Sequence, residues 1–459
     1  MTSCETNINR PHFVSGSIVR HLLVMALTSS IGTMSLFLVD LAGLYFLAVL
    51  KNTAITAAMG YASSIILIAV TAGLGGGVAA SALVSSSIGA GDTDKARDYV
   101  TSNLLFSLMQ GIIIAIVITL FSDNLLLLIN AEGEARYLAR LYILTVSPSI
   151  ILAGCTLCLA AILQGLGDPL RAMYVIVTFS LVTIILDPLL IFNLNLGIQG
   201  PAIASVMGYF VALCLGLHGV FKVHSAINPI RLSKVWHDFR YIWIIAYPAI
   251  LSQLTVPLEN LFITNVISRF GDAIFAGYAV ISRLMPVAFA IAFAMSNAVA
   301  PIIGQNFGAG LYKRVRRTLT QSLLISIGYT FGTSFILSAL SKQVARVFNA
   351  VGNTEDVIVF FCSYLSISYV FVAALRIAQA AFNNLGYPKL SAALSWGRIT
   401  VGTIPLAYLG AILDGWKGVL TGNAIGAAVF GIIAVLLSYG ITNHQSLKSK
   451  EPLVRSPTQ

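Results

Sequence analysis

The sequence predicts an all-α polytopic membrane protein with twelve transmembrane helices in two lobes of six. Of its 459 residues, 57% are hydrophobic and 10% are charged, and the mean hydropathy is +0.88. Soluble globular chains are roughly 45–50% apolar and about 25% charged, so the composition excludes that class. About 20 apolar residues cross a bilayer as a helix, and we find twelve runs of that length. An internal duplication divides these runs into two sets of six.

The duplication has a period of 219 residues and is visible at four landmarks in the same order. Asp40, near the middle of the apolar run 29–50, corresponds to Glu259 in the run 241–267. The other three landmarks are glycine-containing turns, the last with a slip of one residue: Gly89–Arg97 with Gly308–Arg316, Leu166–Pro169 with Leu385–Pro388, and Gly197–Gly200 with Gly415–Gly418. Chance matching of glycine-rich loops would not keep this order, so we interpret the halves as a duplication.

Each half is expected to supply six spans, with boundaries set by the apolar runs. The first six are residues 21–49, 54–84, 101–122, 137–163, 172–194 and 199–221, and the last six are 241–268, 272–303, 318–341, 357–382, 390–413 and 415–440. This predicts an N-lobe at 1–221, a cytoplasmic linker at 222–240, a C-lobe at 241–440 and a cytoplasmic tail at 441–459. Because each half has an even number of spans, the lobes should be related by a pseudo-twofold axis along the membrane normal, as parallel repeats are.

Basic residues are unevenly divided between the two sides of the predicted membrane. Of the 27 Lys and Arg residues, seventeen lie in segments on the side of the N-terminus and seven on the opposite side. By the positive-inside bias, both termini and the linker are cytoplasmic in a multi-pass protein of the inner or plasma membrane. Residues 1–20 lack the apolar core of a signal peptide, so we expect no cleavage. The net charge of +10 then reflects basic loops rather than a nucleic-acid partner.

No pattern in the sequence indicates a cofactor, a metal site or an enzyme. The spacing Cys155-x-x-Cys158 has no second pair, so these residues are interpreted as buried small hydrophobes. The run Gly73–Gly77 lacks the Gly-Lys-Ser/Thr of a phosphate loop and indicates close helix packing instead. A membrane enzyme would need His, Asp or Cys residues clustered at a membrane face, and the sequence shows no such cluster.

After the charges near the span ends are assigned to the loops, three acids and three arginines remain inside the predicted spans: Asp40, Asp187, Glu259, Arg283, Arg376 and Arg398. A charged side chain at the bilayer centre costs about 2.5–3.5 kcal/mol on insertion scales, so such residues are usually functional or paired. Asp40 has Thr33 and Ser29 seven and eleven residues before it, which places all three on one helix face. This polar face should point toward protein or water rather than lipid.

Asp187 has a similar polar face, formed with Thr183 and Ser180. Pro188 follows at once and cannot donate to the carbonyl four residues earlier, which leaves an acceptor beside the carboxylate for a proton relay, a cation or a water. With Arg140 assigned to the loop at its span end, no arginine remains in the spans of this half. Two nearby carboxylates in a poorly solvated pocket cannot both ionise cheaply. We predict that Asp40 and Asp187 carry the coupling ion. A structural role in pinning helices together is the alternative.

Glu259 differs from the two aspartates because its half of the chain contains all three intramembrane arginines. Its helix face also carries Thr255 and Ser252. Two roles are open for Glu259. It could form a salt bridge within the C-lobe, with Arg283 or Arg376 as partner, or it could take a direct part in transport.

With these features, the chain resembles the multidrug and toxic compound extrusion (MATE) family of transporters over nearly its whole length. The resemblance depends on the two six-span lobes and on motifs that are specific together and weak singly: GAGDTDKAR at Gly89–Arg97, PIIGQNFGAG at Pro301–Gly310, the LGDP and LGYP turns, and Gly-x-x-Gly-x-Ala at Gly197–Ala202. Within the family, two N-lobe aspartates make the chain more similar to the DinF-like branch.

The resemblance implies an N-lobe pocket that maps onto five residues: Asp40, Asp187, Tyr142, Thr183 and Ser205. Thr183 stands where the family usually has Asn, which weakens the match slightly. The sodium-coupled branch uses a C-lobe Glu on span seven and an Asp on span ten. Glu259 lies a turn from that Glu position, whereas span ten offers Arg376 and Gln379 but no Asp. We include Glu259 and Arg376 among the expected pocket residues, and we expect protons rather than sodium to drive transport.

The resemblance also implies a function. It indicates a secondary active antiporter that exports amphipathic, mostly cationic drugs and toxic organic compounds by alternating access. Its coupling ion would be H⁺, with Na⁺ as the alternative, and we expect a monomer in the lipid bilayer without a further cofactor. A flippase or exporter of a lipid-linked or anionic amphiphile in the same superfamily is the second candidate, because three membrane arginines suit an anionic head group. The repeats and turns match the drug exporters better.

Overall fold

The computed structural model describes residues 11–50 and 52–448, and every regular element within them is a helix. The predicted tail therefore lies outside the described residues from position 449 on, as does Cys4. Contacts between Cα atoms divide the described chain into two compact units. Unit 1 contains Val24–Val84 and Thr93–Asn260, and unit 2 contains Pro11–Leu23, Ser85–Asp92 and the chain from Leu261 on.

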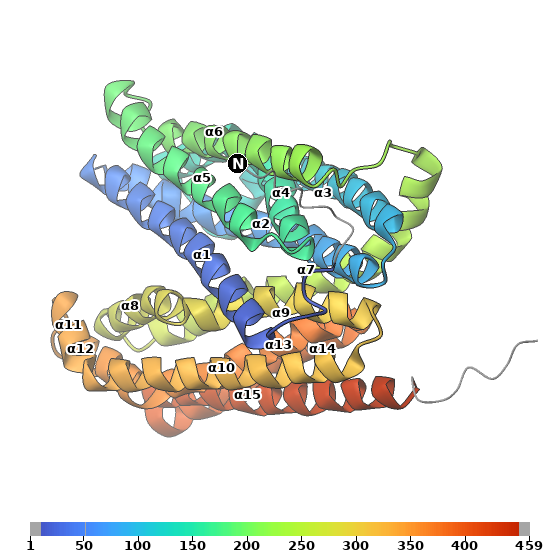
Figure 1. Cartoon of the computed structure of the whole chain (residues 1–459). Coiled ribbons are helices and arrows are strands. Elements are labelled where there is room, and N and C mark those ends of the chain that lie inside the picture. The colour runs from blue at the N-terminus through green and yellow to red at the C-terminus, as the bar shows by residue number, and fades with distance from the viewer. Residues whose placement is uncertain (1–10, 51, 449–459) are drawn as a thin grey trace, which may run out of the picture. The chain divides into compact units, whose positions relative to one another are not determined.

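Unit 1 is built mainly from the helices of the first half of the chain (Figure 1). These are α1 (Ile18–Val49), α2 (Thr53–Gly89), α3 (Thr93–Leu128), α4 (Gly133–Gly165), α5 (Pro169–Pro188), α6 (Gln199–His218) and α7 (Leu232–Ser268), with the short π-helices η1 (Leu189–Asn193) and η2 (Gly219–Val223). Helices α5 and α6 lie side by side, and α4 packs against α3, α5 and α6. A buried apolar cluster joins α2, α3, α4 and α6, and Tyr142 belongs to it.

Unit 2 contains the helices of the second half. They are α8 (Asp272–Ala288), α9 (Ala290–Gly308), α10 (Tyr312–Ala339), α11 (Ser341–Val347), α12 (Asn353–Phe360), η3 (Phe361–Leu365), η4 (Ser366–Ser368), α13 (Tyr369–Asn384), α14 (Pro388–Gly397), η5 (Arg398–Thr403) and α15 (Ile404–Lys448). Helix α13 packs against α9, α10, α14 and α15. The largest buried cluster of the unit includes Met285, Phe289 and Phe361.

The described helices account for twelve membrane crossings. Ten helical segments are long and apolar enough to cross a bilayer, and α8 with α9, bent by 46°, makes an eleventh. The last segment, Pro388–Asn443, turns back on itself, because Asp414 and Gly415 have non-helical backbone angles. In a straight helix Gly402 and Gly426 would be about 36 Å apart. Instead, a Cβ on Gly426 would lie 2.8 Å from the carbonyl carbon of Gly402, so this segment is two antiparallel spans.

The backbone confirms the duplication. Residues with positive φ recur at the 219-residue offset in four pairs: Gly91 with Gly310, Asn130 with Asn349, Gly133 with Gly352, and Gly167 with Gly386. The slipped pair also matches, with φ of 54° at Gly197 and 57° at Gly415. Positive φ is uncommon outside glycine, so the recurrence at two asparagines is informative. The two halves therefore share their turn geometry as well as their apolar pattern.

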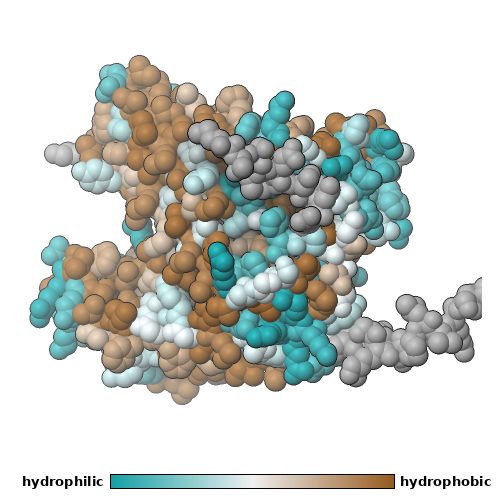
Figure 2. All heavy atoms as spheres, in the orientation of Figure 1, coloured by the Kyte–Doolittle hydropathy of each residue, from teal (hydrophilic) through white to brown (hydrophobic). Residues whose placement is uncertain are grey.

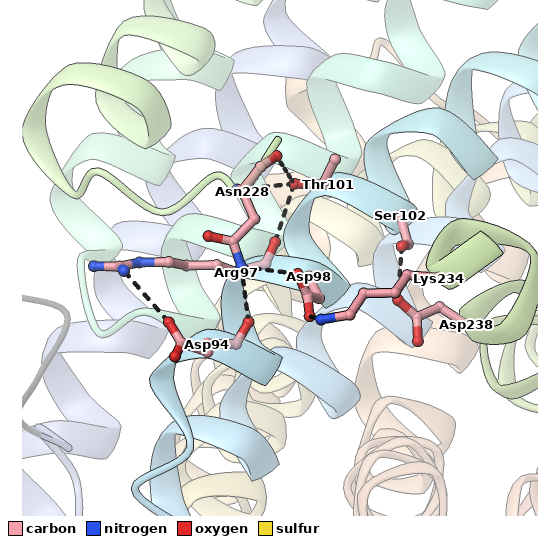
Figure 3. A network of polar contacts seen from close by, with 8 residues as sticks. All are labelled: Asp94, Arg97, Asp98, Thr101, Ser102, Asn228, Lys234 and Asp238. Atoms are coloured by element: carbon pink, nitrogen blue, oxygen red, sulfur yellow. Dashed lines mark hydrogen bonds and ion pairs between the residues drawn. The ribbon is translucent and has the colours of Figure 1, made fainter. Parts of the chain in front are cut away.

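The segment after η2 is held against the start of α3 (Figure 3). The backbone of Asn228 exchanges two hydrogen bonds of 3.2 Å with the side chain of Thr101. Asp98 accepts hydrogen bonds from the side-chain amide of Asn228 at 2.8 Å and from Lys234 Nζ at 2.7 Å. Lys234 is already helical, because α7 begins at Leu232 within the predicted linker. The predicted linker at 222–240 thus includes the first turns of α7, which pack against α3.

Large apolar side chains cover much of the surface of each unit. Figure 2 shows hydrophobic residues along the middle of the helices and hydrophilic ones toward their ends. Leu120, Phe335 and Leu413 are among the most exposed of these apolar residues. In water such a surface would be costly, whereas in a bilayer it faces hydrocarbon. The distribution agrees with a multi-pass membrane protein.

Candidate functional site

Helices α1 and α5 are parallel and contact each other in one constant register. A Cβ on Gly32 would lie 3.5 Å from Ile176, and a Cβ on Gly43 would lie 3.7 Å from Oδ2 of Asp187. These contacts are eleven residues apart on both helices, so one register holds over three turns. Between them, Ser180 Oγ donates to Ser35 Oγ at 2.9 Å. Small residues on α1 therefore bring α5 close enough to place Asp187 against it.

Asp187 is the most confined charged group of this site. The residue is 1% exposed, and its Oδ1 has no hydrogen-bond partner within the described residues. It stands at the end of α5, where Pro188 leads into the π-helix η1 and Leu194 N donates to Leu189 O at 3.1 Å. Local π-helices often occur at functional sites. A buried carboxyl with an unused oxygen is costly when ionised unless a cation or a proton compensates it.

Asp40 lies on α1 three residues before Gly43, which contacts Asp187. Residues three apart on a helix are neighbours on its surface, so Asp40 and the contact with Asp187 are on adjacent turns of one face. The Asp40 side chain is exposed, and no hydrogen bond or ion pair joins it to another described residue. Thr33, predicted on the same face, donates to the carbonyl of Ser29 at 3.0 Å. The two aspartates thus differ in burial, although Asp187 contacts α1 one turn from Asp40.

Two tyrosines complete the surroundings of the carboxyls. Tyr142 of α4 is buried and interacts electrostatically with both Asp187 and Asp40. Tyr209 of α6 interacts electrostatically with Asp40, and its ring stacks on Phe179 with centroids 3.8 Å apart. Tyr209 was not predicted from the sequence. The available signal was its position four residues after Ser205, which places both on one face of α6.

The predicted hydroxyl residues lie where α5 meets α6. Thr183 is buried, and its Oγ1 donates to Phe179 O at 2.9 Å on its own helix. A Cβ on Gly208 would be 2.5 Å from Thr183 Oγ1, so the absence of a side chain at Gly208 allows α6 to approach α5 at this point. Ser205 is half-buried on α6. Four helices of unit 1, namely α1, α4, α5 and α6, therefore supply the predicted N-lobe residues.

The remaining predicted residues are divided between the two units. Glu259 is half-buried near the end of the α7 portion that packs in unit 1, and Ser252 and Thr255 on its helix are buried. Arg376 of α13 belongs to unit 2, where its guanidinium lies 5.0 Å from the ring centre of Phe293. The expected pairing of Glu259 with an arginine stays a prediction, as do the expected roles of all the site residues.

No cluster of three or more His, Cys, Asp or Glu in the described part of the chain could hold a metal ion. Cys155, Cys158 and Cys362 are buried free thiols, whereas Cys214 is exposed. Exposure of Cys214 on a membrane-spanning helix is compatible with contact with lipid. The pair Cys155-x-x-Cys158 is thus buried within α4, as the sequence predicted.

The protein has twelve apolar spans in two matching sets, and the first set contains carboxylates inside the membrane. These features are typical of a polytopic membrane transporter. A family model described as MatE matches residues 21–189 and 248–409, and the chain belongs to this family of multidrug and toxic compound efflux transporters. It is 27% identical to a protein of Shewanella oneidensis named FAD transporter, over 94% of this chain and 97% of that protein. It is 22% identical to the multidrug export protein MepA of Staphylococcus aureus, over 96% of this chain and 98% of MepA.

Solved structures agree on the fold. The MATE transporter VcmN of Vibrio cholerae superposes with a TM-score of 0.88 at 24% identity, covering 95% of this chain and 98% of VcmN. A Pyrococcus furiosus transporter of the MOP superfamily, whose binding pocket is described as having reversed polarity, gives 0.88 at 22% identity. The latter comparison covers 97% of this chain and 99% of the other. The sequence-based assignment to the MATE family and its all-α fold is confirmed, and the chain is a multi-pass membrane transporter.

Proposed function

We propose that this transporter is a secondary antiporter that exports amphipathic, mostly cationic organic compounds in exchange for protons. The observation that supports it most is the buried Asp187 carboxyl, whose Oδ1 has no hydrogen-bond partner among the described residues. Such a group is stable when neutral, or when a cation lies against it. It can therefore alternate between a proton and a positively charged ligand. Alternating access by a monomer, with both termini in the cytoplasm, belongs to the same proposal.

The proposed coupling is competition for the carboxyls of unit 1. Asp40 is accessible, and the buried Asp187 of α5 contacts α1 one turn further along, so a proton that reaches Asp40 has a short path inward. A cationic substrate interacts with the ionised form and loses that interaction when the proton arrives. The π-helix η1 directly after Pro188 provides a backbone segment that can change when the charge of Asp187 changes.

Sodium is the alternative coupling ion for this site. Na⁺ binds oxygen ligands, and Thr183 on α5 and Ser205 on α6 add oxygen-bearing side chains to the two carboxylates of unit 1. Thr183 already donates its proton to Phe179 O, so its Oγ1 lone pairs remain available as acceptors. Dye transport under a proton gradient and under a sodium gradient distinguishes the two coupling ions. Purified protein in liposomes should move a cationic dye when a proton gradient is imposed and not when a sodium gradient is imposed at constant pH.

A second candidate is export of anionic aromatic amphiphiles. Arg376 lies on the face of Phe293 in unit 2, and the relative from Shewanella oneidensis is named for FAD, an anionic aromatic compound. An arginine above an aromatic ring can bind planar anions through charge and stacking. Flavin-loaded liposomes provide the comparison. Proton-driven movement of the flavin without movement of the cationic dye would favour this candidate and overturn the cationic preference.

A further inference from the structure

Unit 1 has a cavity of about 260 Å³ outside the carboxylate site, where α5 begins and α6 passes into η2. Its polar lining consists of Asp168, Arg171, Tyr174 and His218. Leu170 and Leu215 provide apolar walls, and both are exposed. The cavity therefore combines charged groups with an apolar rim at the ends of two membrane-spanning helices.

Asp168 and Arg171 line this cavity as an ion pair, and the buried His224 contacts Asp168. Arg171 Nη1 forms an ion pair with Asp168 Oδ2, and His224 Nε2 lies 3.0 Å from the same oxygen. Asp168 Oδ1 accepts a hydrogen bond of 3.1 Å from the backbone N–H of Arg171. Burial alone would raise the pKa of Asp168, but the hydrogen bonds from His224 and Arg171 outweigh it and lower the pKa to about 2.

In this ion pair, Arg171 is the charged group that is more accessible to a ligand. The Asp168 side chain is 14% exposed and both of its oxygens have partners, whereas the Arg171 side chain is 42% exposed. A guanidinium carries five N–H donors, so those not used by Asp168 remain for an external acceptor. His218 is exposed and lines the cavity from α6. The polar side of the cavity thus offers the unused N–H donors of Arg171 and the imidazole of His218.

The second repeat provides an internal control for a purely structural explanation. Its equivalent turn has the same backbone, with φ of 88° at Gly386 against 90° at Gly167. It forms without the charges, because Tyr387 stands at the position of Asp168 and Leu390 at that of Arg171. Tyr387 makes no side-chain cap, whereas Asp168 does. The turn itself therefore does not require the ionic cluster, which suggests an additional use in the first repeat.

The position of the cavity favours a lipid over a soluble ligand. It opens where two apolar spans end, and Leu170, Tyr174 and Leu215 on its rim are exposed where acyl chains would lie. Tyr174 fits the aromatic belt of a membrane–water boundary. The positive-inside bias predicts that this boundary is the cytoplasmic one, whose leaflet carries anionic lipids.

We propose that this cavity binds the phosphate head group of an anionic phospholipid, held by Arg171 and His218. The acyl chains rest against Leu170 and Leu215. Arginine suits this task because its planar donor fork matches phosphate oxygens. The site is separate from the Asp40–Asp187 region and does not depend on which substrate is exported.

Thermal unfolding of the purified full-length protein in detergent tests the proposal. Phosphatidylglycerol and phosphatidylcholine are titrated separately, and inorganic phosphate is titrated in the presence of phosphatidylcholine. The wild-type protein should gain stability with phosphatidylglycerol only. Arg171→Gln should weaken the apparent affinity about fivefold or more, since one Lys or Arg at an anionic surface contributes about 1 kcal/mol. His218→Glu should weaken it as well, because it places a carboxylate against the phosphate.

Arg317→Gln is the matched control, because Arg317 is an exposed arginine at the start of α10 outside the cavity. It should leave the response to phosphatidylglycerol unchanged. If Arg171→Gln fails to fold because Asp168 loses its partner, His218→Glu decides, since His218 is not part of that ion pair. Equal responses in all variants would overturn the proposal. Full stabilisation by inorganic phosphate would also overturn it, in favour of a soluble anion.

Discussion

Gly304 and Ser85 occupy equivalent positions in the two repeats and are in direct contact: a Cβ on Gly304 would lie 1.9 Å from Ser85 Oγ. The 219-residue offset relates the two positions, so residues that correspond in the two repeats contact each other within unit 2. The flanking contacts obey the same exchange. A Cβ on Gly89 would meet Gln305 O at 2.0 Å, and one on Gly308 would meet Ser86 O at 1.9 Å.

This symmetry predicts the result of exchanging the two residues. Gly304→Ser alone should destabilise the protein by about 1–3 kcal/mol, because the added atoms overlap with Ser85. Ser85→Gly in the same chain should recover most of the loss. Recovery should be incomplete, because Asn384 Oδ1 also lies 2.9 Å from the Gly304 Cβ position. We would compare the melting temperatures of the three variants. Additive effects in the double variant would argue against direct contact between positions 85 and 304.

The sequence predicted the fold because its signals are long and repeated. Apolar runs located all twelve spans, and the repeated turns identified the duplication. The helices extend beyond the predicted spans at polar ends, as α3 and α10 do, because hydropathy reports the bilayer boundary and not the helix end. The docking of α7 up to Asn260 in unit 1 was not predicted, since it depends on contacts such as Ile250 with Gly75.

The site residues that could be predicted from the sequence are those in which helical spacing places polar residues on one face. Asp40 and Asp187 are intramembrane acids on polar helix faces, and the structure places α1 against α5 at Asp187. Tyr209 was missed because a half-buried tyrosine in an apolar run has no distinctive spacing. The pairing of Asp168 with His224 joins residues 56 positions apart, and no local pattern links them. Contacts of this kind follow from packing and not from sequence neighbours.

The ion pair at Asp168 predicts a specific dependence of stability on pH. Its pKa falls from the ordinary value of 3.8 to about 2 in the folded protein. A lowered folded-state pKa gives stability that is present above about pH 4 and is lost as pH falls toward 2. Asp168→Asn should therefore melt at a lower temperature than wild type at pH 6, and the difference should shrink as the pH approaches 3. A difference that does not change with pH would contradict the ionic role.

Glu259→Gln tests the role of the acid in α7. If an arginine partner holds Glu259, neutralising it leaves that arginine without compensation, and removal of one member of a buried pair typically costs about 3–5 kcal/mol. We therefore expect reduced expression or thermal stability at least as large as the loss of transport. Normal expression and stability together with abolished transport would instead indicate a direct role in transport.

Substitutions of Gly43 test whether export needs the space between α1 and the carboxyl of Asp187. A Cβ at this position would be 3.7 Å from Asp187 Oδ2, an ordinary contact, so Gly43→Ala should preserve export. Gly43→Leu would place a branched side chain against the carboxyl and should reduce proton-driven export strongly. Gly60→Leu is the control, because a Cβ there meets no atom within 4 Å. Export by Gly43→Leu at the wild-type rate would show that the space beside Asp187 is not used.

The most direct test of the account measures proton-driven dye export by Asp40→Asn and Asp187→Asn in liposomes. Asp272→Asn serves as the control, because Asp272 is an exposed acid at the start of α8. Circular dichroism and melting temperature establish that each variant is folded. We predict that both Asp40→Asn and Asp187→Asn abolish export under an imposed proton gradient, whereas the control retains it. Export by both variants at wild-type rates would contradict proton coupling through these carboxyls.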